Sequence, residues 1–296
     1  MTSSLRKKEA LTAWLFITPY LIGFTLFHFL PVLLSAVLSL TDMRYISMID
    51  KTHLIGLGNY IEMSRDPEFW NAFRNSIVYS VCFVPFVMAA GLLLAVLVNQ
   101  KIHFRNGIRA MIFMPYVSNM VAIAIVWSIL LDPVDGIVNQ TLRALGVTNA
   151  PMWLMGSKTA LYSVVMIAVW RAVGLQFVTY LAALQEVPTE LKEAAQIDGA
   201  GRFQQFIYVT LPLIRNTTFL LTITSIITSL KNFTIIQVLT AGGPGNSTTV
   251  LPLNIVDTAF ASARMGYASA QAMVMFILVM GVTIVQWVGK NRSEIY

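Results

Sequence analysis

The segment EAAQIDGAGRFQQFIYVTLP, residues 193–212, separates two long apolar runs and has the pattern of a short folded element. Four residues at the spacing i, i+3, i+4 and i+7 fall on one helical face: Leu191, Ala194, Ala195 and Asp198. Gly199 follows, and glycine readily adopts the left-handed backbone conformation that ends a helix. The pattern therefore predicts a helix that stops at a turn at Gly199.

The residues on either side of this turn complete the element. Pro188 suits the first turn of a helix, where a missing N–H costs nothing. Beyond the turn, a second amphipathic stretch carries three apolar residues on one side: Phe203, Phe206 and Ile207. Pro212 then opens the next apolar run. Because alanine side chains let another surface approach closely, the segment is predicted to dock against a partner.

The segment resembles the EAA motif of binding-protein-dependent ABC importer permeases, the MetI-like type I family. The positions that match at the family spacing are Glu193, Ala194, Ala195, Asp198, Gly199, Ala200, Phe206, Leu211 and Pro212. In that family the segment is a cytoplasmic coupling helix, here at about residues 189–208, that fits a cleft on the ATPase subunit. The alternative is an ordinary amphipathic helix on a membrane surface.

The composition is that of a multi-spanning membrane protein. The chain has 296 residues, of which 56% are hydrophobic and 11% charged, whereas about 25% of residues are charged in soluble domains. Six apolar runs are long enough to cross the hydrocarbon core: 10–40, 75–98, 110–131, 159–184, 216–240 and 265–289. We therefore expect an all-α integral membrane protein with six transmembrane helices, and the resemblance implies the MetI-like permease fold.

The distribution of Lys and Arg predicts the orientation in the membrane. Arg6, Lys7 and Lys8 precede the first run, and a basic turn at residues 101–109 joins the second and third runs. Both features favour cytoplasmic termini by the positive-inside rule, which also places residues 193–212 in the cytoplasm. The net charge of +6 is spread over loops, so it indicates topology and not nucleic-acid binding. The first run exceeds a signal-peptide core, so we expect it to be retained.

Other matches extend the resemblance to the carbohydrate branch of the family, the MalF/UgpA-like permeases. They are Pro115-Tyr116 with Trp127, residues 136–139, residues 182–185 with Pro188, and the run TAGGPGNST at 240–248. That run lacks the lysine of a phosphate-binding P-loop and is predicted to be a turn. The expected organisation is residues 1–70 for the cytoplasmic N-terminus, first helix and outer loop, 71–289 for the type 1 transmembrane domain, and 290–296 for a cytoplasmic tail.

Residues with catalytic or metal-binding chemistry are sparse. The single cysteine, Cys82, lies in a predicted span, and three isolated histidines form no metal-ligand spacing. There is no nucleophile motif and no pair of carboxylates placed for acid–base work. We therefore expect a non-catalytic subunit with no metal and no cofactor of its own, ATP and Mg²⁺ being bound by a partner ATPase.

The predicted spans contain none of the fourteen Asp and Glu residues. A proton-coupled carrier usually needs a buried carboxylate as its relay, so this mechanism is disfavoured. Sodium-coupled carriers can bind their ion through carbonyls and hydroxyls and are disfavoured less strongly. An ion-coupled secondary transporter of a small polar solute remains the alternative to an ATP-driven importer.

Polar and aromatic residues in the spans are the candidates for a solute path. They are Tyr116, Asn119, Trp127, Arg171, Gln176, Asn232, Gln237 and Gln271. Each has a structural alternative, because aromatic residues anchor span ends and amides bond neighbouring helices. A lone cation in a bilayer costs about 3 kcal/mol, so Arg171 must face water, a helix partner or another subunit. Lys231 is expected to extend to the outer interface.

The sequence thus predicts one of two permease subunits of an importer for a sugar, such as a di- or oligosaccharide, or a related polyol derivative. The resemblance implies a heterodimer with a second permease, two cytoplasmic ATPase subunits and an extracytoplasmic solute-binding protein. The expected location is the bacterial cytoplasmic (inner) membrane, which the chain crosses several times with both termini inside.

Overall fold

The computed structural model describes residues 2–44, 52–100 and 104–293, and side chains are described from residue 11 to residue 288 within those ranges. Lys101 of the predicted basic turn and residues 294–296 of the predicted tail lie outside the described residues. The described chain is helical except for loops and one antiparallel bridge between Thr41 and Leu54. It divides into two compact units, residues 1–66 with 255–278 and residues 67–254 with 279–296.

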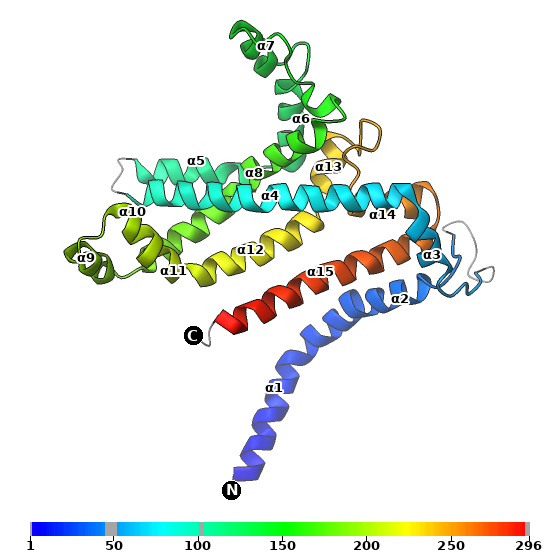
Figure 1. Cartoon of the computed structure of the whole chain (residues 1–296). Helices are drawn as coiled ribbons and strands as arrows, with labels where there is room; N and C mark the ends of the chain where they lie inside the picture. Colours follow the sequence, from blue (N-terminus) through cyan, green and yellow to red (C-terminus); the bar gives the residue numbers. More distant parts are fainter. Residues whose placement is uncertain (1, 45–51, 101–103, 294–296) are drawn as a thin grey trace. The chain divides into compact units, whose positions relative to one another are not determined.

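The first unit contains the N-terminal helices and the start of the last one. Its elements are α1 (Thr2–Phe24), η1 (Thr25–Phe29), α2 (Leu30–Leu38), α3 (Gly58–Arg65), η5 (Asp257–Ala261) and the first part of α15 (Met265–Ser293). The π-helical turn η1 joins α1 to α2, and Figure 1 shows the curve of these three elements. Pro19 and Pro31 flank this turn, and proline inside a helix removes a backbone hydrogen bond and bends the axis.

The second unit contains the elements around the two candidate sites. They are α4 (Pro67–Asn99), α5 (Arg105–Val117), α6 (Met120–Leu130), α7 (Ile137–Ala144), η3 (Trp153–Met155), α8 (Ala160–Glu186), α9 (Thr189–Ile197), α10 (Arg202–Gln205), η4 (Phe206–Thr210), α11 (Leu211–Leu213), α12 (Arg215–Leu230), α13 (Thr234–Leu239) and α14 (Leu251–Val256). α8 packs along α4 and α5, and α12 packs against α4 (Figure 1).

The described helices confirm a multi-spanning protein with as many as six crossings. Four helical stretches are long and apolar enough to span a membrane: 11–38, 67–99, 160–186 and 265–288. Two bent pairs bring the number to six if each pair counts as one span: α5 with α6, and residues 202–213 with α12.

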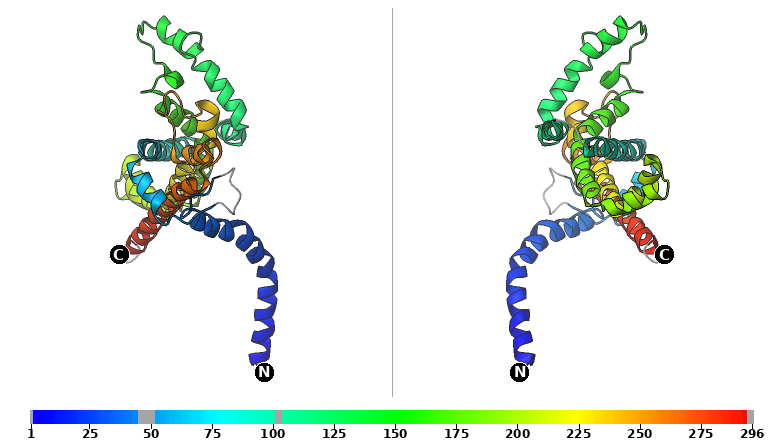
Figure 2. Two further views of the ribbon diagram at one scale, coloured as in Figure 1. Left: turned by 90° about the vertical axis from the view of Figure 1, so that its right-hand side faces the viewer. Right: turned by 90° about the vertical axis from the view of Figure 1, so that its left-hand side faces the viewer.

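The third predicted span is not one continuous helix. α5 and α6 meet at an angle of 98°, and both views in Figure 2 show α6 turning away from α5. The bend lies at Ser118 and Asn119, whose backbones are extended (ψ of 152° and 127°). The side chain of Asn119 accepts hydrogen bonds from the backbone N–H groups of Val121 (2.8 Å) and Ala122 (3.3 Å). Asn119 is therefore the N-cap of α6, which explains why the helix restarts there.

The fifth predicted span, roughly 216–240, was correct at its start to within one residue and wrong at its end. α12 begins at Arg215, after a 68° bend that follows Pro212, so the proline lies before this helix in α11. It ends at Leu230, and Lys231 is its exposed C-cap instead of a residue inside a span. A separate short helix, α13, then follows. A cation beside the free carbonyls of a helix C-terminus interacts favourably with the helix dipole.

Glycines allow close helix contacts in the second unit. A Cβ placed on Gly91 of α4 would lie 2.5 Å from the Cβ of Gln176 on α8. A Cβ on Gly174 of α8 would lie 2.8 Å from the carbonyl oxygen of Ile112 on α5. Small residues let helix backbones approach in this way, and such contacts are typical of helix association in membranes. The α4–α8–α5 packing therefore depends on these two positions.

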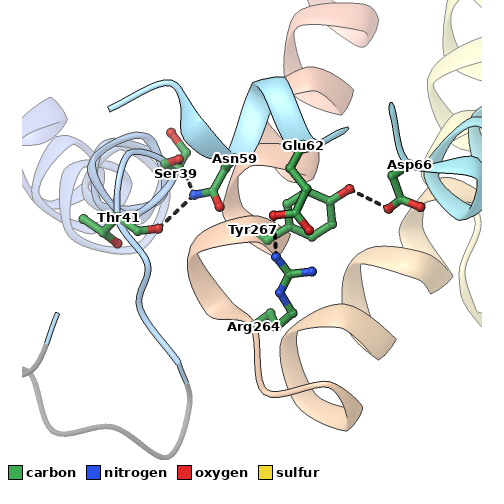
Figure 3. A network of polar contacts seen from close by, with 7 residues as sticks. All are labelled: Ser39, Thr41, Asn59, Glu62, Asp66, Arg264 and Tyr267. Atoms are coloured by element: carbon green, nitrogen blue, oxygen red, sulfur yellow. Dashed lines mark hydrogen bonds and ion pairs between the residues drawn. The ribbon is translucent and has the colours of Figure 1, made fainter. Parts of the chain in front are cut away.

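A polar clasp holds the first unit together. It consists of Ser39, Thr41, Asn59, Glu62, Asp66, Arg264 and Tyr267 (Figure 3). The buried amide of Asn59 donates to the carbonyl oxygens of Ser39 and Thr41, both at 2.8 Å.

Two further contacts of the clasp join the region of α3 to the start of α15. Arg264 forms an ion pair of 2.6 Å with Glu62, and the Tyr267 hydroxyl donates to Asp66 at 2.5 Å. The hydrogen bond to Glu62 raises the pKa of the Arg264 guanidinium. The clasp thus ties the end of α2 to α3, and α3 to α15.

The two halves of the clasp are expected to differ in their contribution to stability. Asn59→Ala leaves two buried carbonyl oxygens without their donor, which costs about 1–3 kcal/mol. Glu62→Gln removes an ion pair whose side chains are 51% and 40% exposed, and such pairs contribute less than about 1 kcal/mol. Thermal unfolding of the purified protein checks this order. An equal or larger loss from Glu62→Gln would show that the ion pair is the main tie.

Candidate functional site

The predicted docking segment folds as a helix, a tight turn and a second helical stretch. We call residues 189–213 the coupling segment. α9 starts at Thr189 with Pro188 as its N-cap (φ −56°, ψ 131°), so the prediction of Pro188 in the first turn was wrong by one position. Proline restricts the preceding residue to extended backbone, and Val187 is accordingly extended (φ −69°, ψ 117°). This junction separates α9 from the long helix α8.

The turn after α9 depends on the backbone of Gly199. Its φ is +83°, a conformation that strains any residue with a Cβ. Its N–H donates to the carbonyl oxygen of Gln196 at 3.1 Å, and the Ala200 N–H donates to that of Ala195 at 2.9 Å. Asp198 is the helix C-cap, with its N–H bonded to the carbonyl oxygen of Ala194 at 3.0 Å. These bonds satisfy the terminal carbonyls of α9 within the segment itself.

The second half of the coupling segment is capped locally as well. The side chain of Gln204 accepts a hydrogen bond from the Gly201 N–H at 2.8 Å, and Gln205 donates to the Ala200 carbonyl at 2.8 Å. α10 then runs into the π-helical stretch η4, which contains Phe206, and into α11, which contains Leu211 and Pro212. Because its caps are internal, the segment keeps its shape without help from a partner.

The coupling segment presents uncovered apolar side chains. The exposed fractions are 45% for Leu191, 87% for Ile197, 74% for Phe203 and 76% for Tyr208. Glu193, Ala194 and Asp198 are exposed too, whereas Ala195, Ala200 and Phe206 are half-buried. Charged and large apolar residues are thus exposed together on one short element, as on a surface that binds another protein or lies on a membrane.

An arginine pair supports the end of α8 from which the coupling segment starts. With its amide oxygen turned toward α5, Gln185 accepts from Arg105 (2.9 Å) and Arg109 (2.8 Å). Arg105 also donates to the carbonyl oxygen of Val98 on α4 at 3.0 Å. The basic turn was predicted here only as an indication of topology, and the support that its arginines give to the end of α8 was not predicted. Three helices are joined immediately before α9, so the segment starts from a fixed base.

Three of the eight predicted solute-path residues line one cavity. Tyr116, Arg171 and Asn232 come from α5, α8 and the link between α12 and α13. The cavity has a volume of about 270 Å³, and we call it the Arg171 cavity. Its full lining is Phe83, Tyr116, Met120, Ala168, Arg171, Ala172, Thr228, Asn232, Thr234 and Ile235. It lies beside the bend between α5 and α6, because Tyr116 and Met120 flank that bend.

Arg171 is the only charged residue among those that line this cavity. Its guanidinium carbon lies 5.9 Å from the centre of the Tyr116 ring, within range of a cation–π contact. Its Nε is buried and forms no hydrogen bond within the described part of the chain. The predicted requirement for a wet surface or a partner is therefore met here by a cavity and an aromatic ring.

Asn232 is held in place by a residue that the sequence analysis did not single out. Its side-chain amide donates to the hydroxyl of Tyr79 on α4 at 2.7 Å, and Tyr79 in turn stacks on Phe83, with ring centres 5.8 Å apart. Phe83 also lines the cavity. A tyrosine hydroxyl in the middle of an apolar run needs a partner, and this signal was present in the sequence.

The other five predicted path residues do not line this cavity. Asn119 caps α6, and Trp127 packs edge-on against Trp170 with ring centres 5.4 Å apart. Gln176 is buried and donates to the Ser225 hydroxyl at 3.2 Å, which joins α8 to α12. Gln237 is exposed on α13, and Gln271 is fully buried on α15 in the other unit. For Gln176 the structural alternative, an amide that bonds a neighbouring helix, describes the observed contact.

Two loops of the second unit, one after α6 and one after α13, meet at a second cavity. It measures about 350 Å³, and its lining comes from the ends of α6 and α13, the stretch around Asp132, η3 and the 240–244 turn. Backbone N–H groups of Asp135 (2.8 Å) and Val134 (2.9 Å) bond the Asp132 carboxylate and lower its pKa. Asn71 and Asn75 of α4 donate to carbonyl oxygens of Asn246 and Thr249, which anchors the loop.

Metal-ligating side chains do not gather in the described part of the chain: no group of three or more His, Cys, Asp or Glu could hold an ion there. Cys82 is a free, half-buried cysteine on α4. The described sites thus contain hydrogen-bonding groups, the half-buried cation of Arg171 and the exposed surface of the coupling segment.

The sequence is similar to those of permease proteins of known transport systems. The chain is 33% identical to the lactose transport system permease protein LacF of Rhizobium radiobacter, over 99% of this chain and 98% of that protein. It is 31% identical to the sn-glycerol-3-phosphate transport system permease protein UgpA of Pectobacterium atrosepticum, over 83% of each.

The fold has a counterpart of known structure. A chain of a bacterial alginate ABC transporter, solved in complex with an alginate pentasaccharide-bound periplasmic protein, superposes with a TM-score of 0.83 at 22% identity, over 97% of this chain and 96% of that one. The model of the family described as binding-protein-dependent transport system inner membrane component matches residues 87–291. The chain thus belongs to the family of inner membrane components of binding-protein-dependent transport systems.

Proposed function

We propose that this chain is a permease subunit of an ATP-driven importer for a sugar or related polyol derivative, and that it forms half of the translocation path. The observation that carries the proposal is the coupling segment, which is internally capped and exposes Ile197 and Phe203. Its nine motif residues, Glu193 to Pro212, are proposed to contact an ATPase subunit. ATP and Mg²⁺ are bound by that partner, and this chain itself hydrolyses nothing.

Membership of the family supports a proposal for the rest of the complex. The proposed partners are a second permease as a heterodimer, two cytoplasmic ATPase subunits and an extracytoplasmic solute-binding protein. Both termini and the coupling segment are placed on the cytoplasmic side of the membrane. The names of relatives at 31–33% identity, a lactose and a glycerol-3-phosphate permease, support a sugar or polyol solute.

The proposed mechanism links the coupling segment to the Arg171 cavity. Closure of the ATPases on ATP moves the segment. Because the segment starts where Gln185 ties α8 to α5, the motion passes to helices that line the cavity. Rocking of these packed helices would then shift the population between inward- and outward-facing states. Tyr116, Arg171 and Asn232 are the proposed solute contacts of this chain.

Affinity purification in mild detergent tests the composition of the complex. We expect this chain to bring with it a second six-span protein and an ATPase in a ratio of one permease pair to two ATPases, identified by mass spectrometry. Isolation of this chain alone, in a stable and monodisperse form, would contradict the proposal. The same material supplies the complex for the experiments below.

The energy source separates the importer from an ion-coupled carrier. Uptake into cells is expected to stop on ATP depletion and to survive an ionophore that dissipates ion gradients for as long as ATP is maintained. Uptake that follows the opposite pattern would identify a secondary transporter. The coupling segment would then need a different partner.

A further inference from the structure

The Arg171 cavity carries a positive charge without a visible counter-charge. A guanidinium stays protonated in proteins, and none of the other nine lining residues is acidic. The helices that surround it, α4, α5, α6, α8 and α12, contain only two carboxylates. These are Glu68 in the first turn of α4 and Glu186 at the last residue of α8. The charge therefore faces the cavity without a balancing acid from its own helices.

Among the residues that line the cavity, Arg171 contributes a buried donor, its Nε, that has no partner within the described part of the chain. No hydrogen bond to the Arg171 guanidinium occurs within the described residues, and its Nε is buried. The hydroxyl of Thr228 donates to the backbone of Thr224 (2.7 Å), and Asn232 donates one amide hydrogen to Tyr79 (2.7 Å). These two bonds leave the Thr228 hydroxyl oxygen and the Asn232 amide oxygen able to accept, whereas Arg171 offers a planar fork of donors, a geometry that suits two oxygens of a carboxylate or phosphate.

The solutes named for the relatives do not determine whether the solute of this chain is charged or neutral. Lactose, named for one relative, is neutral, whereas sn-glycerol 3-phosphate, named for another, is an anion. We infer that the solute of this chain is an anionic sugar or polyol, bearing a carboxylate or a phosphate, and that Arg171 binds this group during passage. The inference rests on the proposed function and adds the charge class of the solute.

The remaining surface of the cavity fits the rest of such a solute. Tyr116 and Phe83 offer aromatic faces, and Asn232 and Thr234 offer polar groups for hydroxyls. The volume of about 270 Å³ is near the lower end of small-molecule sites, which run from about 300 to 1,000 Å³. The cavity formed by this chain therefore has room for about one monosaccharide-sized unit of the solute.

Matched pairs of solutes test the inference. The probes are D-glucuronate against D-glucose for a carboxylate, and glycerol 3-phosphate against glycerol for a phosphate. Each is titrated into the purified complex in lipid nanodiscs at constant ionic strength, without the binding protein. We expect at least one anion to bind about tenfold or more tightly than its neutral partner. The pair in which the anion binds more tightly shows whether the site prefers a carboxylate or a phosphate.

Variants assign the preference to Arg171. In Arg171→Gln the anion and its neutral partner are expected to bind equally, and Arg171→Lys, which retains the charge, is expected to keep part of the preference. Lys231→Gln is the matched control, because it removes one positive charge from an exposed residue next to Asn232. It is expected to leave the preference unchanged. Each variant is first confirmed to be monodisperse and to retain its ATPase subunits.

Three results overturn the inference. Equal binding within both pairs, or no binding of any probe, shows that Arg171 does not select anions, as happens if a carboxylate of the second permease neutralises it. A preference that survives Arg171→Gln places the selectivity elsewhere. If Lys231→Gln abolishes the anion preference as fully as Arg171→Gln does, the preference comes from the overall positive charge of the protein and not from a contact with Arg171. In each case the complex still contains its ATPases, so the importer proposal stands.

Discussion

Gly199→Pro is expected to reduce solute uptake about 5- to 150-fold, the range of a coupling free energy of about 1–3 kcal/mol, while the protein stays folded in the membrane. The native φ at this position is +83°, and proline is fixed near −65°. Proline also removes the N–H that donates to Gln196 at 3.1 Å. Since no atom lies within 4 Å of a Cβ placed here, the damage comes from the backbone and not from crowding. The turn opens, and residues 200–210 point in a new direction.

Two readouts and one matched variant check this prediction. Uptake is measured in cells at equal protein level, and the ratio of ATPase to permease is measured after affinity purification. Gly146→Pro is the control, since Gly146 has a φ of +88°, an N–H bonded to Arg143 at 3.0 Å and open space around its Cα. It lies after α7, outside the coupling segment. Normal uptake and normal ATPase recovery by Gly199→Pro would remove the segment from the coupling role.

Gly91→Ala is expected to lower the stability of the second unit by about 1–3 kcal/mol, the usual cost of overpacking. The new methyl group would lie 2.5 Å from the Cβ of Gln176 and 3.2 Å from its carbonyl carbon, so α4 and α8 must move apart. Gln176 also donates to Ser225 on α12 at 3.2 Å. The shift therefore disturbs a junction of three helices.

Thermal unfolding of the purified complex measures this loss. Gly281→Ala on α15 is the matched control, because no heavy atom lies within 4 Å of a Cβ at that position. Alanine is the better helix former by up to about 1 kcal/mol, so this control is expected to be neutral or stabilising. An unchanged midpoint for Gly91→Ala would mean that the α4–α8 contact is looser than the structure indicates.

The coupling segment could be read from the sequence because its structure is local. The end of α9 depends on Gly199 and on bonds between residues at most five positions apart, which short-range patterns encode directly. The number of crossings could be predicted for a related reason. The transfer of an apolar run into lipid depends on its composition and length, and both are visible in a single sequence.

The bends could not be predicted from hydropathy. Residues 110–131 are apolar on both sides of Ser118, so composition shows one span where the structure has two helices at 98°. Asn119 was noted as a solute contact, although its position before an apolar run is that of a helix N-cap. The end of α12 at Leu230 was missed because an apolar stretch, which forms α13, continues beyond Lys231.

Which residues line the Arg171 cavity depends on tertiary packing. Tyr116, Arg171 and Asn232 are separated by more than fifty residues in the chain, and no spacing rule joins them. Gln176 and Trp127 had the same polar or aromatic character but face a helix partner and another indole ring. Residue type alone therefore identified the candidates, and only the packing of α4, α5 and α8 separated them.

The bend at Ser118 and Asn119 implies an order of events during synthesis. Residues 105–130 enter the membrane as an apolar stretch long enough for one straight crossing. The packing that holds α5 in its final direction comes from α8, with Gly174 closely apposed to Ile112. α8 begins thirty residues after the end of α6, so it leaves the ribosome later. The Arg171 cavity beside the bend has lining residues from α8 and from the stretch after α12, so it forms only after those later segments have been made, and a nascent chain truncated before them lacks it.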